Sequence, residues 1–426
     1  MARFLRAALL AAYLSTSVFA AQSPCGPGSA CPSDSPCCSA YGQCGVGAYC
    51  LGGCDPRYSF DLKSCAPAPV CQSQDYKLTS LNDIADISTY LGDTSKTNWV
   101  ASGKPVAYNN NAILLTMAPD TVGTLVSSTH YVWYGKIEAT LTTSIGAGVV
   151  TAFILMSDSK DEIDYEFVGV DLNHAQTNFY SQGVTNYNNE VNISASSTNT
   201  QTHTYAIDWT TDQITWSVDG NVLRTKKRSE TWNSTSNRWD FPQTPSRVQI
   251  SLWPAGLPSA GKGTIDWAGG LVDWNSPDMK NGYYYAIFNE IKITCYDPPA
   301  GADVQGKKSY IYKDTKATNQ SIQITDSTVI LQSLYATGDN PGTQPNAAQS
   351  SNSPQTVPGV SGIGTRGDLP GGSSNAASGS NVTAGSTTSF TQGTTKSGAL
   401  GKQQSLRTGG SAFAVLVAIV LVCVWL

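Results

Sequence analysis

Charged side chains are scarce in this sequence of 426 residues. Lysine and arginine together number 26 and aspartate and glutamate 31, which gives a charged fraction of 13% and a net charge of -5. Because there is no basic surplus, we expect no nucleic-acid partner. Only 3 histidines occur, and outside the cysteine-rich N-terminal region no His or Cys cluster has metal-ligand spacing. We therefore expect neither a catalytic metal nor any other cofactor.

Long hydrophobic runs are also missing, except at the two ends of the chain. Residues 1–20 place Arg3 and Arg6 before an apolar run that ends in small residues, which is the pattern of a secretory signal peptide cleaved after Ala20. Residues 411–426 are almost all apolar, but this run is shorter than the roughly 20 residues that a membrane helix needs.

The C-terminal pattern matches the signal for a glycolipid (GPI) anchor better than a retained transmembrane helix. A polar spacer separates the apolar tail from a trio of small residues. We expect attachment at Ser397 or Gly398 and removal of residues 398–426. The chain would then be secreted and anchored through the lipid at the cell membrane and cell wall.

Three acids alternate with apolar residues in the segment from Asp161 to Gly169. Glu162, Asp164 and Glu166 are spaced by two, so on a β-strand they share one face. Like charges in a row repel one another, and an ordinary strand avoids them. Crowding raises the pKa of one acid while another stays ionised, and such a pair is what glycosidic cleavage requires. A solvated edge strand with a chance acidic run is the alternative.

The distance between the two outer acids sets a geometric condition. Their α-carbons would lie about 13 Å apart on a flat strand, at about 3.3 Å per residue. A retaining enzyme has carboxyl groups about 5 to 5.5 Å apart, so the long side chains must lean inward.

The segment Glu162-Ile-Asp-Tyr-Glu166, with the tryptophan-rich segment that follows later, resembles the signature of glycoside hydrolase family 16. Within it, the sequence resembles the Crh family of fungal cell-wall chitin-glucan transglycosylases over about residues 75–300. The resemblance implies that Glu162 is the nucleophile and Glu166 the general acid/base. Asp164 would be an auxiliary acid that orients Glu162. It also implies chitin and β-glucan as partners.

Nine cysteines lie within residues 25–71. So dense a segment has little room for an apolar core, and residues 21–72 must be held by disulfides. The spacing, with adjacent Cys37 and Cys38, resembles a hevein-type chitin-binding module. That resemblance implies the pairs Cys25–Cys38, Cys31–Cys44 and Cys37–Cys50. For the remaining four cysteines we expect Cys54–Cys65 and Cys71–Cys295.

The same resemblance places a sugar-binding set in this module, namely Ser39, Tyr41 and Tyr49. Gln43 stands where a second aromatic is expected, so one stacking surface is missing. We expect weak chitin binding or a purely structural cap, and a disulfide-rich spacer without binding is the alternative.

Residues 73–300 contain short apolar or alternating runs separated by Gly, Asn, Asp and Ser. This pattern predicts an all-β antiparallel sandwich, and the family resemblance implies a jelly roll. Expected strands include residues 131–139, 149–156, 204–209, 214–218, 247–253 and 285–294, with a hairpin turn at Asp219-Gly220. Residues 301–335 form an extension after this domain. Residues 336–397 form a Ser/Thr-rich stalk that is too polar to fold.

Several aromatic and amide residues are candidates for binding substrate. Trp253, Trp267 and Trp274 lie in glycine-rich, loop-like contexts, and we expect them to stack on sugars rather than to pack structurally. Asn178 and Tyr180 follow the acidic strand, where a neighbouring strand would bring some of this segment beside Glu166; an ordinary structural strand is equally open.

The resemblance to the Crh family implies a retaining transglycosylase, expected to be monomeric, that cleaves chitin and transfers it to β-glucan or chitin acceptors. An endo-β-glucanase or chitinase of the same fold is one alternative, because the acids would serve both reactions. A non-catalytic wall adhesin or lectin is another. N-glycosylation is expected at the sequons of Asn192, Asn233, Asn319 and Asn381.

Overall fold

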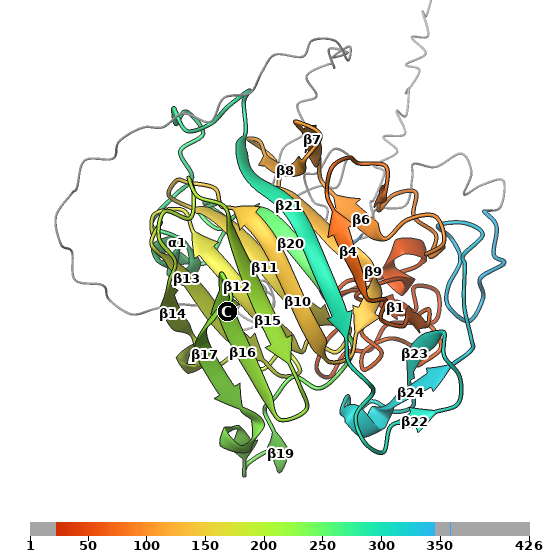
Figure 1. Cartoon of the computed structure of the whole chain (residues 1–426). Coiled ribbons are helices and arrows are strands. Elements are labelled where there is room, and N and C mark those ends of the chain that lie inside the picture. Colours follow the sequence, from red (N-terminus) through yellow and green to blue (C-terminus); the bar gives the residue numbers. More distant parts are fainter. Residues whose placement is uncertain (1–22, 346–357, 359–426) are drawn as a thin grey trace, which may run out of the picture.

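A computed structural model describes residues 23–345 and residue 358. Two eight-stranded sheets form the main body (Figure 1). The first has the order β17-β16-β15-β10-β21-β8-β7, and β4 also pairs with β21. Its strands are β4 (Gln74–Lys77), β7 (Val106–Tyr108), β8 (Ala112–Met117), β10 (Gly135–Thr142), β15 (His203–Trp209), β16 (Gln213–Val218), β17 (Asn221–Lys227) and β21 (Tyr284–Cys295).

The second sheet has the order β14-β13-β12-β11-β20-β9-β6-β5. Its strands pair antiparallel, apart from the parallel pair β5–β6 at one edge. They are β5 (Ile84–Asp86), β6 (Trp99–Ser102), β9 (Thr124–Val132), β11 (Val149–Ser157), β12 (Glu162–Val168), β13 (His174–Tyr180), β14 (Val191–Ser194) and β20 (Ser246–Pro254). The expected all-β sandwich is confirmed.

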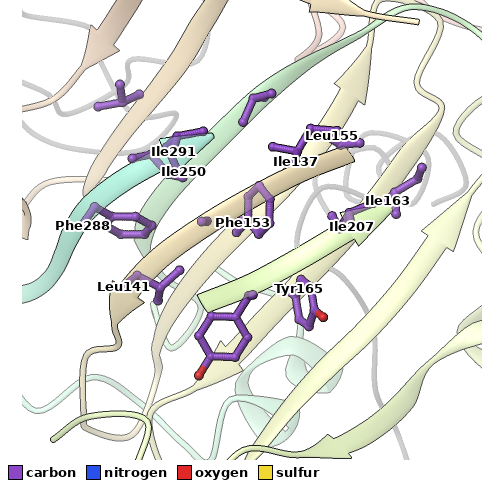
Figure 2. Close-up of a cluster of buried hydrophobic side chains, with 14 of the residues drawn as sticks. Ile137, Leu141, Phe153, Leu155, Ile163, Tyr165, Ile207, Ile250, Phe288 and Ile291 are labelled. Atoms are coloured by element: carbon purple, nitrogen blue, oxygen red, sulfur yellow. The ribbon is translucent and has the colours of Figure 1, made fainter. Parts of the chain in front are cut away.

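The core lies between the two sheets (Figure 2). On β12 the apolar residues Ile163, Tyr165 and Phe167 are at most 2% exposed and belong to this core. Phe153 of β11 and Ile207 of β15 approach them from neighbouring strands of the two sheets. Each large side chain buried in this way stabilises the fold by roughly 1.5–3 kcal/mol. The burial also fixes the register of β12, because a one-residue slip would turn these side chains outward.

One expected strand is wrong. Residues 131–139 do not form a single strand, because β9 ends at Val132 and β10 begins at Gly135. Tyr134 has φ 67° between them, and the chain passes from the second sheet to the first at this corner. A Cβ at Gly135 would lie 2.5 Å from the Thr294 carbonyl oxygen, so only glycine permits this close approach.

The hairpin expected at Asp219-Gly220 is present between β16 and β17. Both residues have positive φ, 50° and 81°, as a tight hairpin turn requires. The turn at residues 158–161 that leads into β12 likewise contains Lys160 with φ 63°.

The smaller elements frame the sandwich. They are β1 (Cys37–Cys38), β2 (Cys44–Gly45), η1 (Gly47–Cys50), η2 (Tyr187–Asn189), η3 (Arg228–Glu230), β18 (Trp232–Asn233), β19 (Arg238–Trp239), α1 (Lys262–Trp267) and η4 (Asn319–Ser321). The extension after residue 300 adds a four-stranded sheet, in which it pairs with a strand that precedes the sandwich: β3 (Ala68–Pro69), β22 (Asp303–Val304), β23 (Ser309–Tyr312) and β24 (Ile322–Thr325).

Within the described residues five disulfides are present, and they are the five pairs that were expected. Cys71–Cys295 joins residues 224 apart in sequence and so ties the two ends of the sandwich together. The other four lie within the N-terminal module: Cys25–Cys38, Cys31–Cys44, Cys37–Cys50 and Cys54–Cys65.

The N-terminal module is docked on the sandwich. The Gly53 amide donates to Asp158 Oδ1 (2.9 Å) and lies 3.3 Å from the Tyr131 hydroxyl, and Tyr131 in turn donates to the same Asp158 oxygen (2.8 Å). Arg57 Nη1 donates to the Gln182 carbonyl (3.1 Å). The module and the sandwich therefore share a hydrogen-bonded interface.

The folded part of the chain continues past the expected start of the stalk. Ala336 is fully buried with Leu51 and Leu331, and its carbonyl accepts from the Gly47 amide (2.8 Å). The Gly338 amide donates to the Ser64 carbonyl (2.9 Å). Ala336 and Gly338 thus pack against the N-terminal module.

Several expectations lie outside the described residues. These are the signal peptide, the anchor residues Ser397 and Gly398, Asn381 and most of the stalk. Within the part of the chain that is described, no helix has the length and apolarity to cross a bilayer.

Candidate active site

The three acids of β12 lie on the face opposite the core, which we call the acid face. Glu162, Asp164 and Glu166 are 4%, 0% and 2% exposed, and β12 runs through them without a bulge. In register with them on β13 are Tyr180, Asn178 and Gln176. On the other side β11 places Met156, Ile154 and Ala152. The alternation of the sequence thus brings all three carboxyls to one face.

Asp164, in the middle, has a strongly perturbed environment. Burial, and secondly the negative charge of Glu162, raise its pKa well above the usual value. Neither carboxyl oxygen has a hydrogen-bond partner of good geometry among the described residues, although the Asn178 backbone amide faces the carboxyl and favours its ionised form. A protonated Asp164 between two glutamates can donate a hydrogen bond to one of them. Its position therefore suits a group that shares a proton with Glu162.

A cation lies behind the acids, on the core side of β13. Arg224 of β17 donates to the carbonyl and hydroxyl of Thr177 (2.6 and 2.7 Å), and its guanidinium lies 4.3 Å from the Trp216 ring centroid. The Trp216 indole nitrogen donates to the Asp164 carbonyl (3.1 Å). The charge of Arg224 lowers the pKa of Asp164 and so limits its rise. Sequence reasoning missed this residue, because β17 is rich in polar and charged residues and nothing in its sequence indicates that the Arg224 side chain points inward.

Strand β20 brings unpartnered polar atoms to the same face. Gln249 and Ser251 pair with Ile154 and Ala152, the neighbours of Asp164 and Glu166. Gln249 Oε1, Ser251 Oγ and Trp253 Nε1 are buried and have no hydrogen-bond partner among the described residues. Because unsatisfied buried polar atoms are rare and costly, this group indicates a face built to bind a hydroxyl-rich ligand. Trp253 was expected here; Gln249 and Ser251 were missed.

A stacked pair of tryptophans stands at the Glu166 end of the acid face. The rings of Trp253 and Trp267 are 6.0 Å apart with an interplanar angle of 21°. Trp267, in the unexpected helix α1, donates from Nε1 to Gln176 Oε1 (2.7 Å). Since Gln176 lies directly opposite Glu166, the pair is tied to the acid row. Gln176 was also missed.

Trp274 does not join this pair. It packs at the edge of the core against Tyr284, with ring centroids 6.1 Å apart at 61°. Trp274 remains partly exposed, and its stacking on sugar stays a prediction. Trp209 and Trp216, by contrast, are fully buried core residues.

Asn178 and Tyr180 reach the acid face but not at the expected place. Tyr180 lies opposite Glu162 and Asn178 opposite Asp164, so that Gln176 is the residue beside Glu166. The Asn178 side-chain amide donates to the Tyr180 hydroxyl (2.7 Å). The two residues therefore form one polar unit along the first two acids.

The expected sugar-binding set of the N-terminal module is not presented on an open surface. Ser39 and Tyr49 are 2% and 1% exposed, and the Ser39 hydroxyl accepts from the Gln43 amide (3.3 Å). Tyr49 packs among the half-cystines of the module. Only Tyr41 remains half-buried. Stacking by Tyr49 is corrected, because its ring is enclosed by the module itself.

The described sequons differ in accessibility. Asn192 is exposed on the edge strand β14. Asn233 is half-buried and its amide donates to Asp240 Oδ2 (2.7 Å). Asn319 accepts at Oδ1 from the Tyr134 hydroxyl (2.9 Å). Of these three, Asn192 is the most accessible for glycosylation, which stays a prediction at all of them.

Comparison with known proteins agrees with this geometry. Residues 93–269 match the family described as "Glycosyl hydrolases family 16". The chain is 53% identical over 385 residues to "Crh-like protein 2" of Aspergillus fumigatus, which covers 88% of this chain and 86% of that protein. The chain belongs to glycosyl hydrolase family 16.

Further relatives of this family 16 member carry similar names. The chain is 56% identical over 337 residues to "Crh-like protein 3" of Botryotinia fuckeliana, covering 79% of this chain and 75% of the relative. Among solved structures, "Apo Crh5 transglycosylase" aligns with a TM-score of 0.52 and 30% identity over 64% of this chain and 100% of that one. The protein is thus an enzyme of the family 16 type.

Proposed function

We propose that this family 16 enzyme is a retaining transglycosylase that cleaves β-1,4 linkages of chitin and transfers the glycosyl unit to β-glucan or chitin. The observation that carries the proposal is the uninterrupted row Glu162, Asp164 and Glu166 on one face beside unpartnered polar atoms. A related solved structure is titled "Crh5 transglycosylase in complex with NAG", which supports a donor built from N-acetylglucosamine. Such an enzyme would cross-link a fungal cell wall from a secreted, GPI-anchored position.

The first step forms a covalent glycosyl-enzyme. A Glu162 carboxylate oxygen attacks the anomeric carbon, the bond to the leaving oxygen breaks, and Glu166 gives that oxygen its proton. Protonated Asp164 holds the Glu162 carboxylate in position by donating a hydrogen bond to it, and the proton stays on Asp164 when Glu162 forms the ester. The raised pKa of Asp164 favours its protonated form and so supplies this proton.

The second step reverses these roles. Glu166, now a carboxylate, removes the proton from an acceptor hydroxyl, whose oxygen attacks the anomeric carbon and frees Glu162. The product keeps the β configuration. A sugar acceptor held by Trp253 and Trp267 at the Glu166 end would reach the intermediate before water does, and positioning of this kind favours transfer over hydrolysis.

The experiment is an acceptor assay with the purified protein. Chitin oligomers are incubated with a fluorescently labelled β-glucan oligosaccharide, and the labelled products are separated by size and examined by mass spectrometry. Transfer yields labelled chains that are longer by whole N-acetylglucosamine units, and Glu162→Gln abolishes them.

Two outcomes would contradict the proposal. Shortened sugars without labelled chimeric products would make the enzyme a hydrolase of the same fold. A Glu162→Gln protein that retained its effect on wall assembly in cells, with no reaction in either form, would favour a non-catalytic binding role.

A further inference from the structure

A cavity of about 430 Å³ lies where the N-terminal module, the sandwich and the extension meet. We call it the junction cavity. Its lining includes Leu51 of the module, Tyr90 and Arg247 of the sandwich, and Ile330 of the extension. The volume falls within the roughly 300–1,000 Å³ that is typical of ligand pockets. The three acids of β12 are not among its lining residues, so the cavity is separate from the acid row.

The walls of the junction cavity are fixed by backbone hydrogen bonds between the three parts. The Leu331 amide donates to the Leu91 carbonyl (2.8 Å), and the Val70 amide donates to the Lys308 carbonyl (3.1 Å). Leu51 is buried against Leu331 at one side. The cavity is therefore a constructed feature of the assembled chain and not a gap between loosely placed parts.

Arg247 projects an incompletely used guanidinium into this cavity. Its Nε donates to the Ser128 carbonyl (2.6 Å), and within the described part of the chain it forms no ion pair. A Cβ on Gly52 would lie 2.4 Å from Arg247 Nη1. Glycine at this position therefore leaves room for the guanidinium. Tyr90 also lines the cavity, and the charge of Arg247 acts on its hydroxyl. Donors thus remain free for a ligand.

The register of the second sheet connects the cavity with the acid face. Glu162 lies opposite Met156 of β11, and Met156 lies opposite Arg247 of β20. Residues opposite one another in antiparallel strands share a face, so Arg247 and Glu162 belong to the same side of the sheet. Two strand spacings separate them, which is about 10 Å. A chain molecule bound over Glu162 could extend to Arg247.

We propose that the junction cavity is an accessory binding site for a neutral oligosaccharide segment of the polysaccharide whose reacting unit lies over the acids. This inference rests on the proposed function of the acid face. Arg247 and Tyr90 offer donors, the Asp93 carboxylate offers an acceptor, and Leu51 and Ile330 offer apolar surface. Sugars present both hydroxyls and apolar ring faces, so they match this mixture.

The test measures binding without turnover. In a Glu162→Gln background, calorimetry compares chitohexaose and laminarihexaose with the corresponding trimers. Thr328→Trp introduces a large ring at an exposed position of the cavity lining and should lower the affinity for at least one hexamer about fivefold or more, while trimer affinity changes less than about twofold. Thr315→Trp, at an exposed position of the same extension outside the cavity, is the matched control and should change neither.

A second variant guards against a folding artefact. Arg247→Lys keeps the charge but loses the planar fork, and it should also weaken hexamer binding selectively. Thermal unfolding of each variant checks the fold. Equal losses for hexamer and trimer, an unchanged hexamer affinity, or displacement of the hexamer by inorganic phosphate would overturn the inference. Because binding is measured directly, absence of transfer activity would refute the proposed function without deciding this site.

Discussion

At the scale of single residues, the acid face contains a carboxyl group, Asp164, whose burial lowers the stability of the fold. Asp164 is fully buried next to Glu162, and its oxygens lack good hydrogen bonds among the described residues. Burying an acid in this way costs free energy of folding, which a structural residue would have no reason to carry. Functional sites are where such costs persist.

Asp164→Asn should therefore stabilise the protein and impair it at once. The raised pKa means that the folded state keeps a proton which the unfolded chain loses above about pH 4. The wild type loses stability relative to the variant as pH rises from there. We expect the variant's thermal midpoint to be higher at pH 7 by on the order of 3 °C, with little difference at pH 4, and its kcat to fall about tenfold or more. Calorimetry and the acceptor assay measure both; full activity would contradict the assigned role.

Gln176 is expected to act through Trp267. Gln176→Leu removes the acceptor of the Trp267 indole, a hydrogen bond worth about 0.5–1.5 kcal/mol. KM for the donor or acceptor should rise by about two- to tenfold while kcat changes less than twofold. Trp274→Phe is the control, since Trp274 packs against Tyr284, and it should leave KM unchanged. A KM increase in the control and not in Gln176→Leu would reverse the two assignments.

At the scale of elements, one face of β20 packs in the core and the other face lies beside the acids. Val248, Ile250 and Leu252 face the core, while Gln249 and Ser251 face the acids. The strand's period of two separates packing from binding. Substitutions one residue apart should therefore have opposite consequences.

Gln249→Leu should leave the thermal midpoint unchanged or raise it, because it removes a buried oxygen without a partner. It should reduce kcat/KM about five- to tenfold, since a sugar hydroxyl loses its partner. The neighbouring Val248→Ala should lower stability by about 2 kcal/mol and leave the activity of the folded protein intact. Parallel melting curves and rate measurements would show the contrast, and a stability loss in Gln249→Leu without a rate effect would speak against it.

At the scale of the whole molecule, the N-terminal module is part of the enzyme's body. Its Gly53 bonds to Asp158 of the sandwich, and Leu51 shares a buried cluster with the extension. Burial raises the pKa of Asp158 to about 7. Tyr131, Arg247 and Asp55 are the other titratable groups that act on it, so the interface carries a pH dependence.

The stability of the interface should fall as pH rises from about 4 to about 7. Folded Asp158 holds its proton up to about pH 7, and the unfolded chain releases it near pH 4, so stability is lost progressively across that window. Asp158→Asn keeps a carbonyl oxygen for Gly53 and Tyr131 and should remove this loss. Asp120→Asn, at an exposed acid, is the control. Thermal midpoints from pH 4 to 8 test it, and parallel curves for wild type and Asp158→Asn would refute it.

Local patterns predicted the local features of this fold. The period-two alternation of β12 sufficed to place the three acids on one face of the strand and Ile163 and Tyr165 on the other. Burial and side-chain direction are set within one strand. The positive-φ turn at Asp219-Gly220 was equally readable. The corner at Tyr134 was not, since the apolar run continues through it and only the packing of two sheets decides where the chain turns.

Features that depend on partners could not be read from the chain. Which residue of β13 faces Glu166 depends on how the loop before it closes, and Gln176 was therefore overlooked. Gln249 and Ser251 became candidates only when every neighbouring donor and acceptor was known. Tyr49 is the residue type expected in a sugar-binding site, but its side chain is buried among the half-cystines of the module.

The docking of Gly53 and Leu51 has a consequence for how such proteins can be rearranged. A cysteine-rich module that hung from a linker could be exchanged or deleted like a detachable tag. Here its removal would strip Asp158 and Tyr131 of a donor and uncover Leu331 and Ala336. Truncated versions of this enzyme that begin after Cys71 would therefore expose apolar side chains and leave hydrogen-bonding groups without partners. Fusing the module to a different protein would carry over only one side of this interface.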